Sequence, residues 1–464
     1  MRWRENAIMR YLSPTPKIIL LGVVTLMIAG LVKVAEYGVN RIVQYLNYDK
    51  MFDFTYCFVT LFVSGFLIII IAIIEKNTRS DARAIRYIVR HRLCAFSYGN
   101  PLHLRDGEIE SSVIVKPVDN GGFRIRIECP SAKFEDVAKL ESVISDSLRN
   151  KYGDYAVTSK SEDVAGRYVD YFIKNVVDDY QKQSLYDSTD DIPSDNVTRL
   201  YIRDEVYIDY SKVLNASTLL CGGTRSGKST AAISTFLLPV LKHGADNYGS
   251  KVVVIDPKSA ELSQCSNVLS PDINGSVEHI LQATRDFNQT RIYRQQIIND
   301  EGKKRSKVVK WFEMGMHPCL LFLDEWISLV DLFPKKASKE KTDYSLSDFQ
   351  GLIKQIATQG ASAGCFLVIS TGQASVGVGG LDSVVNNACG IRILFKPKRD
   401  DAGFIWNSKQ IEVMREWDFV PGDAWYSIDD GIHNSVGFIK FPRMSDSFDE
   451  YGALSELMDK YYDN

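Results

Sequence analysis

The longest uninterrupted apolar stretch lies near the amino terminus. Residues 54–74 contain no charged side chain, and 21 residues are about the number that a helix needs to cross a bilayer core. A second apolar run covers 18–32 and extends to about residue 39 if Lys33 and Glu36 lie at the interface. We therefore predict transmembrane helices at 18–39 and 54–74. A cleaved signal peptide is the alternative for the first run, and a buried core helix is the alternative for the second.

Positive charge is unequal on the two sides of these runs. Basic residues precede the first run and follow the second, whereas the intervening loop holds few; they are Arg2, Arg4, Arg10 and Lys17, then Lys76, Arg79, Arg83, Arg86, Arg90 and Arg92. The positive-inside rule predicts a cytoplasmic segment 1–17, a short outside loop 40–53 and a cytoplasmic remainder in the cell membrane. The stretch 76–92 is either a plain stop-transfer flank or also a contact for anionic lipid.

The next region, residues 75–195, has mixed periodicity. Residues 113–117 and 123–127 alternate as strands do, and the Asp-Asn-Gly-Gly turn at 119–122 separates them. Apolar positions recur at helical spacing over 134–148 and, more weakly, over 168–180. We predict a juxtamembrane segment with a small α/β domain, followed by an acidic linker at 187–195.

From residue 196 to 464, short apolar runs alternate with helical patterns. Strands are predicted at 218–221, 251–258, 319–323, 365–371 and 390–396, and helices at 231–242, 276–298 and 349–361. This alternation is typical of a doubly wound α/β fold with a largely parallel sheet.

The turn between the first of these strands and its helix matches G-x-x-x-x-G-K-[ST]. Such a loop closes backbone N–H groups around phosphates, so the sequence predicts an ATP site. Lys228 is predicted to reach the β- and γ-phosphates and Ser229 to ligate Mg²⁺. The predicted nucleotide-binding residues are Gly222, Gly223, Thr224, Arg225, Ser226, Gly227, Lys228, Ser229 and Thr230.

A second motif completes the chemistry. The apolar run 319–323 is followed by Asp324 and Glu325, which is a Walker B pattern. In this pattern Asp324 is expected to hold the coordination shell of Mg²⁺, and Glu325 is expected to orient and activate the attacking water. Alone, such a strand is common. Downstream of a phosphate loop, it indicates an ATP hydrolase with an additional strand in its sheet.

Composition restricts the partners. The net charge is −3, so any DNA-binding surface must be local or formed by assembly. The basic segments 303–307 and 335–341 are either phosphate contacts or solvated loops, and residues 372–380 are either a pore loop or a surface connection. The eight cysteines are scattered, which favours reduced, buried thiols and argues against zinc or disulfides.

In its motifs the chain resembles the FtsK/SpoIIIE family of DNA translocases from about residue 110 to 430. The matching segments are 222–229, 255–258 with 261–263, Asp324-Glu325, 352–368, 387–395 and 421–423. The resemblance implies a RecA-like fold, a homo-hexamer, ATP-driven movement of DNA and a membrane anchor. Arg392 is a candidate to act on a neighbour's γ-phosphate, and an internal ion pair is its alternative; Arg285, Arg291, Arg294 and Arg399 stay open.

Some features of the sequence differ from the usual pattern of this family, and they narrow the range of functions that we expect. The order Thr371-Gly372-Gln373 differs from the usual Thr-Gln, which leaves open whether Gln373 senses the γ-phosphate. Two apolar runs, a short linker and an end soon after the last strand resemble the TcpA-like coupling ATPases of Gram-positive conjugative plasmids and integrative elements. That resemblance implies relaxase and mating-channel partners. A chromosome-partitioning translocase, a protein-secretion ATPase and a nucleotide switch are the alternatives.

Overall fold

The structure is a computed structural model that describes residues 14–47, 51–77, 80–94, 101–104, 108, 111–118, 121–203, 206–271, 277–334, 345–373, 380–411 and 414–463. The chain forms two compact units, Met1–Val176 and Val177–Asn464. Each unit is described by itself.

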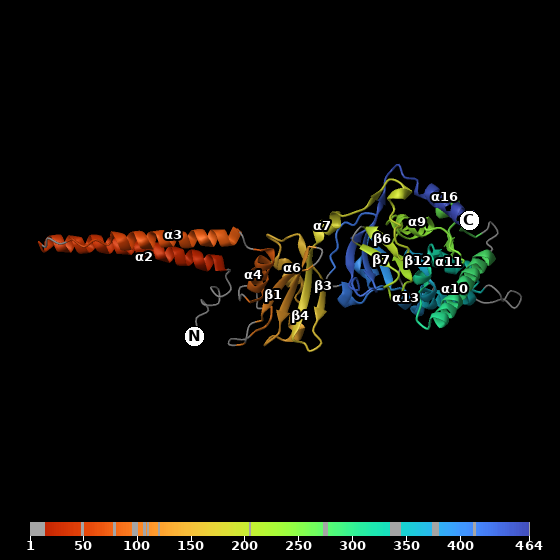
Figure 1. The fold of residues 1–464 in the computed structure, drawn as a ribbon, viewed down its shortest axis with the longest axis horizontal. Helices are drawn as coiled ribbons and strands as arrows, with labels where there is room; N and C mark the ends of the chain where they lie inside the picture. Colours follow the sequence, from red (N-terminus) through yellow and green to blue (C-terminus); the bar gives the residue numbers. More distant parts are fainter. Residues whose placement is uncertain are drawn as a thin grey trace. The chain divides into compact units, whose positions relative to one another are not determined.

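The first unit begins with a helical hairpin, α2 (Pro14–Tyr45) and α3 (Thr55–Asn77), whose helices lie side by side (Figure 1). Ile18–Tyr45 and Thr55–Ile74 are long and apolar enough to cross a membrane. A side-chain carbon on Gly22 would lie 3.0 Å from the carbonyl oxygen of Gly65, so small residues permit this close approach.

Helix α2 continues beyond the predicted end at residue 39. Lys33 forms an ion pair of 2.7 Å with Glu36 on the same helix and donates to the Thr55 hydroxyl of α3 at 2.9 Å. Because the two charges are paired with each other, they do not interrupt the helix. The predicted loop 40–53 is correspondingly shorter.

A four-stranded antiparallel sheet forms the rest of this unit. Its order is β1 (Val113–Val118), β2 (Gly122–Glu128), β4 (Tyr168–Asn175) and β3 (Tyr155–Glu162). Helices α4 (Asp81–Cys94), α5 (Phe134–Val137) and α6 (Glu141–Ser147) share one apolar core with it. Helix α4 contributes Ile85, Val89 and Leu93 to that core, so most of the basic flank 76–92 belongs to the folded domain.

Two expectations for this domain are wrong. Residues 168–180 are not one helix: they form strand β4 and then helix α7 (Val176–Gln181). Val169, Tyr171 and Ile173, at every second position, are fully buried, and this period of two is that of a strand. The helix predicted over 134–148 is divided into α5 and α6. Strand β3 was not predicted.

The second unit begins at Val177, before the predicted boundary at residue 196. The acidic segment 187–195 is part of this unit. The Asp191 carboxylate accepts the backbone N–H groups of Asp187 and Ser188, both at 2.9 Å. Strand β5 (Leu185–Tyr186) pairs with β16 (Arg443–Met444), and Lys242 donates to the carbonyls of Thr189 and Ile192.

An eight-stranded sheet organises this unit. Its order is β10 (Val268–Leu269), β9 (Val252–Ile255), β11 (Cys319–Leu323), β12 (Cys365–Thr371), β8 (Thr218–Cys221), β13 (Ile391–Phe395), β14 (Asp423–Ile428) and β15 (Gly437–Lys440). The first six strands are parallel, and β14 and β15 are antiparallel additions. Strand β12 lies between the phosphate-loop strand β8 and the Walker B strand β11. This confirms the predicted additional strand and the RecA-like α/β class.

Helices cover both faces of the sheet. One face packs on the helix formed by α8 (Lys228–Ala231), η3 (Ala232–Leu237) and α9 (Leu238–Lys242), on α16 (Glu450–Asp463), and on the hairpin β6 (Arg199–Arg203) and β7 (Val206–Asp209). The other face packs on α10 (Glu278–Arg305), α11 (Trp326–Leu332), α12 (Leu346–Gln359) and α13 (Ser383–Ala388). Strand residues alternate between the two cores: Leu320 and Phe322 face one, and Leu321 and Leu323 face the other.

Short elements complete the chain: η2 (Thr189–Asp191), η4 (Leu262–Gln264), η5 (Trp311–Met314), η6 (Ala361–Ala363), α14 (Arg399–Ala402) and α15 (Ser408–Ile411).

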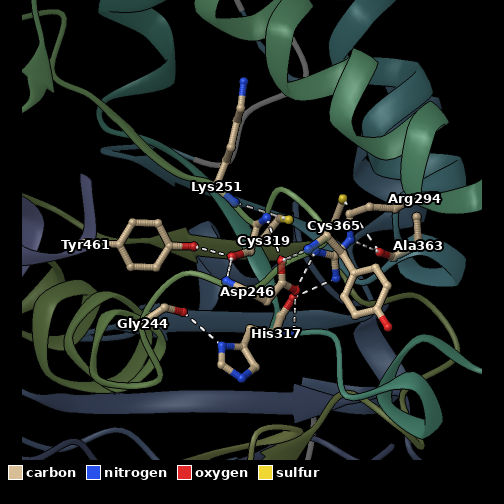
Figure 2. Close-up of polar contacts among 11 residues, drawn as sticks. Gly244, Asp246, Lys251, Arg294, His317, Cys319, Ala363, Cys365 and Tyr461 are labelled. Atoms are coloured by element: carbon tan, nitrogen blue, oxygen red, sulfur yellow. Dashed lines mark hydrogen bonds and ion pairs between the residues drawn. The ribbon is translucent and has the colours of Figure 1, made fainter. Parts of the chain in front are cut away.

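A buried cluster of polar side chains connects helix α10 to the loops next to the strands (Figure 2). Arg294 of α10 is fully buried and forms an ion pair of 3.0 Å with Asp246. Cys319 and Cys365 lie opposite each other in register beside this centre and are free thiols.

Candidate functional site

The predicted site residues gather at one edge of the sheet. Parallel strands β8, β9, β11 and β12 all present their carboxyl ends there. The phosphate loop follows β8, Lys258 follows β9, Asp324 and Glu325 follow β11, and Gly372 follows β12. In doubly wound folds this edge is where ligands bind, because the strand-to-helix loops bring polar groups together.

The phosphate loop has the backbone that its glycines permit. Gly222 has φ +146° and Gly227 has φ +98°, both outside the range of ordinary side chains, and Arg225 between them is left-handed at +58°. The loop is held from one side, because the Gly422 N–H donates to the Ser226 carbonyl at 2.9 Å. Helix α8 starts at Lys228, directly after Gly227. Its N–H groups and positive end are suited to bind phosphate.

Gly227→Ala is expected to damage both the fold and nucleotide binding. A side-chain carbon at Gly227 would lie 2.6 Å from the Gly422 nitrogen, and the positive φ adds strain of about 1–3 kcal/mol. The melting temperature should fall, and a fluorescent ATP analogue should bind more weakly. Gly223→Ala is the control for stability, since nothing lies within 4 Å of its added carbon. Equal melting temperatures for the two variants would contradict the expectation.

Lys228 lies folded over its own loop. Its ammonium donates to the Gly222 carbonyl and, at 3.1 Å, to the Gly223 carbonyl. Burial lowers the pKa of Lys228, while the carboxylates of Glu325 and Asp324 oppose that shift. The Walker A lysine and both Walker B acids are therefore within electrostatic range of one another. A triphosphate offers the ammonium better acceptors than the two carbonyls.

Asp324 and Ser229 are the candidates to supply the oxygen ligands that Mg²⁺ prefers. Burial raises the pKa of Asp324, and the neighbouring carboxylates of Asp256 and Glu325 raise it further. A crowded, partly buried carboxylate of this kind is stabilised by a cation, so these residues fit the metal. Among the described residues there is no group of three or more His, Cys, Asp or Glu arranged to hold a metal ion. One carboxylate and one hydroxyl suit Mg²⁺ that is shared with substrate phosphates.

Glu325 is held at both carboxylate oxygens. Oε2 accepts from the Lys258 ammonium at 2.9 Å, and Oε1 accepts the Gly372 N–H at 2.8 Å. Burial alone would raise the pKa of Glu325, but these two donors outweigh it, and the pKa is lowered. The residue is thus ionised, as a general base must be. Lys258 belongs to the matching segment 255–258, but no role at the site was predicted for it, although its place after a strand's carboxyl end was a usable signal.

A contact from the far end of the chain was also missed. The Thr230 hydroxyl of the phosphate loop donates to Glu450 Oε1 at 3.3 Å, and Glu450 begins helix α16. Burial raises the pKa of Glu450. No motif surrounds residue 450, so only the folded chain shows that α16 reaches the nucleotide loop.

Two other predicted residues, Gln373 and Arg392, have described contacts that do not involve Lys228, Asp324 or Glu325. Gln373 is exposed and directly follows Gly372, and the Thr371 hydroxyl donates to its backbone carbonyl at 3.0 Å. Arg392 lies near the amino end of β13, and its guanidinium donates to the Asn386 carbonyl at 3.3 Å. It pairs in register with Leu219, two residues before β8 ends. Action of Arg392 on a neighbouring subunit stays a prediction.

The alternative arginines divide into two groups. Arg294 is fully buried, and Arg291, itself buried, donates to Asn288 at 2.8 Å and to Gln359 at 2.9 Å. Both arginines are therefore bound to partners in the interior of this chain. Arg399 lies on α14 and donates to the Met414 carbonyl at 2.7 Å. Arg285 on α10 also stays open.

The predicted basic and pore segments are only partly described. Residues 335–341 and most of 372–380 lie outside the described residues. In the segment 303–307, Lys303, Lys304 and Arg305 form the last turn of α10 and pair with Asp300 and Glu301. Their charges are partly neutralised within the helix.

Comparisons with known proteins agree with these motifs. No known family model matches the sequence. The chain is 29% identical over 154 residues to the FtsK domain-containing protein YdcQ of Bacillus subtilis (strain 168), a match that covers 32% of this chain and 28% of that protein.

Two solved structures are similar at low identity. The pCW3 conjugation coupling protein TcpA, in a monomer form with ATPγS, aligns at 15% identity and a TM-score of 0.46, covering 81% of this chain and 99% of that one. EssC (ATPases 2 and 3) from Geobacillus thermodenitrificans aligns at 12% identity and a TM-score of 0.38, covering 67% and 50%. At these scores, function must be argued from the chain's own residues.

The phosphate loop, the Walker B acids and the strand order together describe a P-loop ATPase site on a RecA-like core. With the sequence match to an FtsK domain-containing protein, they show that the chain resembles the FtsK/SpoIIIE family.

Proposed function

We propose that the chain is a membrane-anchored, ATP-driven DNA translocase that couples ATP hydrolysis to DNA movement in conjugative transfer. The observation that carries this is the cluster at the sheet edge. Lys228, Asp324 and Glu325 lie within electrostatic range, and the Glu325 carboxylate accepts from donors that follow the two flanking strands. In this mechanism the loop N–H groups and Lys228 hold the triphosphate, and Glu325 takes a proton from the attacking water. Bound Mg²⁺, held by Ser229 and Asp324, would neutralise phosphate charge.

The organisation of the chain supports the finer part of the proposal. Two apolar helices of membrane-spanning length precede a small antiparallel domain and a single motor unit. We infer that both termini and the motor are cytoplasmic, because positive charge flanks the apolar pair. The proposed active form is a homo-hexameric ring, with a relaxase and mating-channel proteins as partners. Arg392 is the proposed arginine acting on the neighbouring subunit.

The test is the ATPase rate of the full chain, in detergent or nanodiscs, with and without DNA. We expect DNA of either strandedness to stimulate hydrolysis, and the stimulation should weaken as salt rises, since phosphate contacts release counterions. Stimulation by a secreted polypeptide, with none by any DNA, would favour a protein-export ATPase instead. A hydrolysis rate that neither ligand changes would contradict the coupling function.

The cell-level experiment separates conjugation from chromosome partitioning. Lys228→Ala is expected to abolish transfer of a conjugative element while the protein still inserts in the membrane. Normal transfer by this variant would refute the motor function. Intact transfer in cells that lack the chain, accompanied by a chromosome segregation defect, would favour partitioning.

A further inference from the structure

Three neighbouring strand ends converge on the carboxylate of Glu325. Strand β11, which ends just before Asp324, pairs with β9 on one side and β12 on the other. Lys258 comes from the loop after β9, and Gly372 from the end of β12. The contacts of 2.9 Å to Oε2 and 2.8 Å to Oε1 therefore arrive from opposite neighbours. Each carboxylate oxygen has its own donor.

The backbone on both sides of the Lys258–Glu325 pair is fixed. Asp256, which is fully buried, accepts the N–H groups of Lys258 at 3.0 Å, Ala260 at 2.8 Å and Ser263 at 3.1 Å. This carboxylate fixes the loop from which Lys258 projects. Glu325 has a left-handed backbone, with φ +41°, directly before helix α11. A non-glycine residue keeps such a conformation only where its surroundings require it.

The two members of the pair differ in access to solvent. The Lys258 side chain is 47% exposed, whereas that of Glu325 is 16% exposed. An anionic group arriving from solvent can therefore reach the lysine before it reaches the glutamate. A phosphate is the strongest competitor for an ammonium in this setting, because it offers several charged oxygens.

We propose that Lys258 is a positioning residue that restrains Glu325, and that hydrolysis requires a phosphate group to draw Lys258 away from the carboxylate. This inference rests on the proposed ATPase function. While Oε2 accepts from Lys258 and Oε1 from Gly372, each oxygen has one of its two lone pairs occupied, and the carboxylate cannot turn both lone pairs of Oε2 toward an attacking water. Displacement of Lys258 frees Oε2, and the Gly372 N–H keeps the carboxylate oriented. The phosphate belongs either to the DNA backbone or to ATP itself.

The test compares Lys258→Met, Lys258→Arg and wild type, each as the full chain in nanodiscs. The readouts are kcat and KM for ATP with and without a DNA duplex. Lys258→Met should raise the DNA-free kcat severalfold with an unchanged KM, while Lys258→Arg stays near wild type. If DNA supplies the phosphate, the stimulation by DNA should shrink in Lys258→Met. If ATP supplies it, the stimulation ratio should be unchanged while kcat rises in both conditions.

Two further variants make the result specific. Lys354→Met removes a partly exposed lysine that pairs with Asp382 at 2.9 Å, and it should leave every rate unchanged. In a Glu325→Gln background, the gain from Lys258→Met should vanish, because the two residues act through one contact. The Lys258→Met and Lys258→Arg variants should melt at the wild-type temperature, since the Lys258 side chain is 47% exposed.

The outcomes that overturn the inference are definite. An unchanged or lower DNA-free kcat in Lys258→Met, or a gain that persists with Glu325→Gln, overturns the restraint. A raised KM together with a lower kcat would make Lys258 a phosphate-binding residue instead, which also overturns it. Failure of the proposed function is a separate result, in which wild type hydrolyses no ATP with or without DNA.

Discussion

Replacing Glu325 by glutamine is expected to lower kcat for ATP hydrolysis by about two to four orders of magnitude, the usual contribution of a positioned general base. Glutamine has the size of glutamate, and its carbonyl oxygen can still accept the Gly372 N–H that Oε1 accepts at 2.8 Å. It cannot take a proton from water. ATP should therefore bind normally and remain uncleaved. Single-turnover hydrolysis together with binding of an ATP analogue measures both properties.

The controls for this result come from the same chain. Glu301→Gln also removes a carboxylate that accepts a charged donor, here Arg305 at 2.6 Å, but on α10 outside the cluster. It should hydrolyse ATP like wild type. Lys228→Ala should instead lose ATP binding, because its ammonium is the cation of the phosphate loop. A Glu325→Gln protein with wild-type turnover would show that another group activates the water.

The parts of this site that could be predicted are encoded by patterns among residues close together in the sequence. The phosphate loop is a contiguous motif, and the bounds of β11 and β12 agree with the predicted runs 319–323 and 365–371. Both strands are buried on both faces, so their apolar runs have sharp ends. The position of Asp324 and Glu325 at the ligand edge then follows from strand direction alone.

Other parts depend on contacts between distant residues. The 67-residue separation between Lys258 and Glu325 carries no local pattern, and Thr230 meets Glu450 across 220 positions. Strand β4 was misassigned as a helix for a related reason. Within β4 only Asp170 and Lys174 are charged, so no strict alternation marks the strand, and Val176 and Val177 continue an apolar spacing that also fits a helix. Pairing with β2 and β3 decides the question, and pairing is not visible in one segment.

The buried centre around Arg294 was not predictable either, because its partners Ala363, Asp246 and His317 are 69, 48 and 23 positions away in the sequence. The Nε, NH1 and NH2 atoms of Arg294 donate respectively to the Ala363 carbonyl at 2.9 Å, Asp246 at 3.0 Å and the His317 carbonyl at 2.7 Å (Figure 2). Burial alone would raise the pKa of Asp246, but N–H donors from His317, Ser250 and Tyr248, together with Arg294, lower it.

Arg294→Met is accordingly expected to destabilise the second unit by about 3–5 kcal/mol, the cost of breaking a buried ion pair by removing one partner. Methionine fills similar space but leaves two buried carbonyls and the Asp246 charge without their donor. Tryptophan fluorescence during urea unfolding reports this unit, because five of the six tryptophans lie within it: Trp311, Trp326, Trp406, Trp417 and Trp425.

The matched control for Arg294→Met is Lys303→Met on the same helix. Lys303 pairs with Asp300 at 3.4 Å, but the two side chains are 79% and 65% exposed, so the loss should be about 0–1 kcal/mol. Acid gives an independent check. Because the pKa of Asp246 is lowered in the folded chain, its contribution is present above its ordinary pKa and is lost as pH falls below about 4. The difference between wild type and Arg294→Met should therefore narrow in acid. Equal unfolding midpoints for Arg294→Met and Lys303→Met at neutral pH would show that the buried pair does not stabilise this unit.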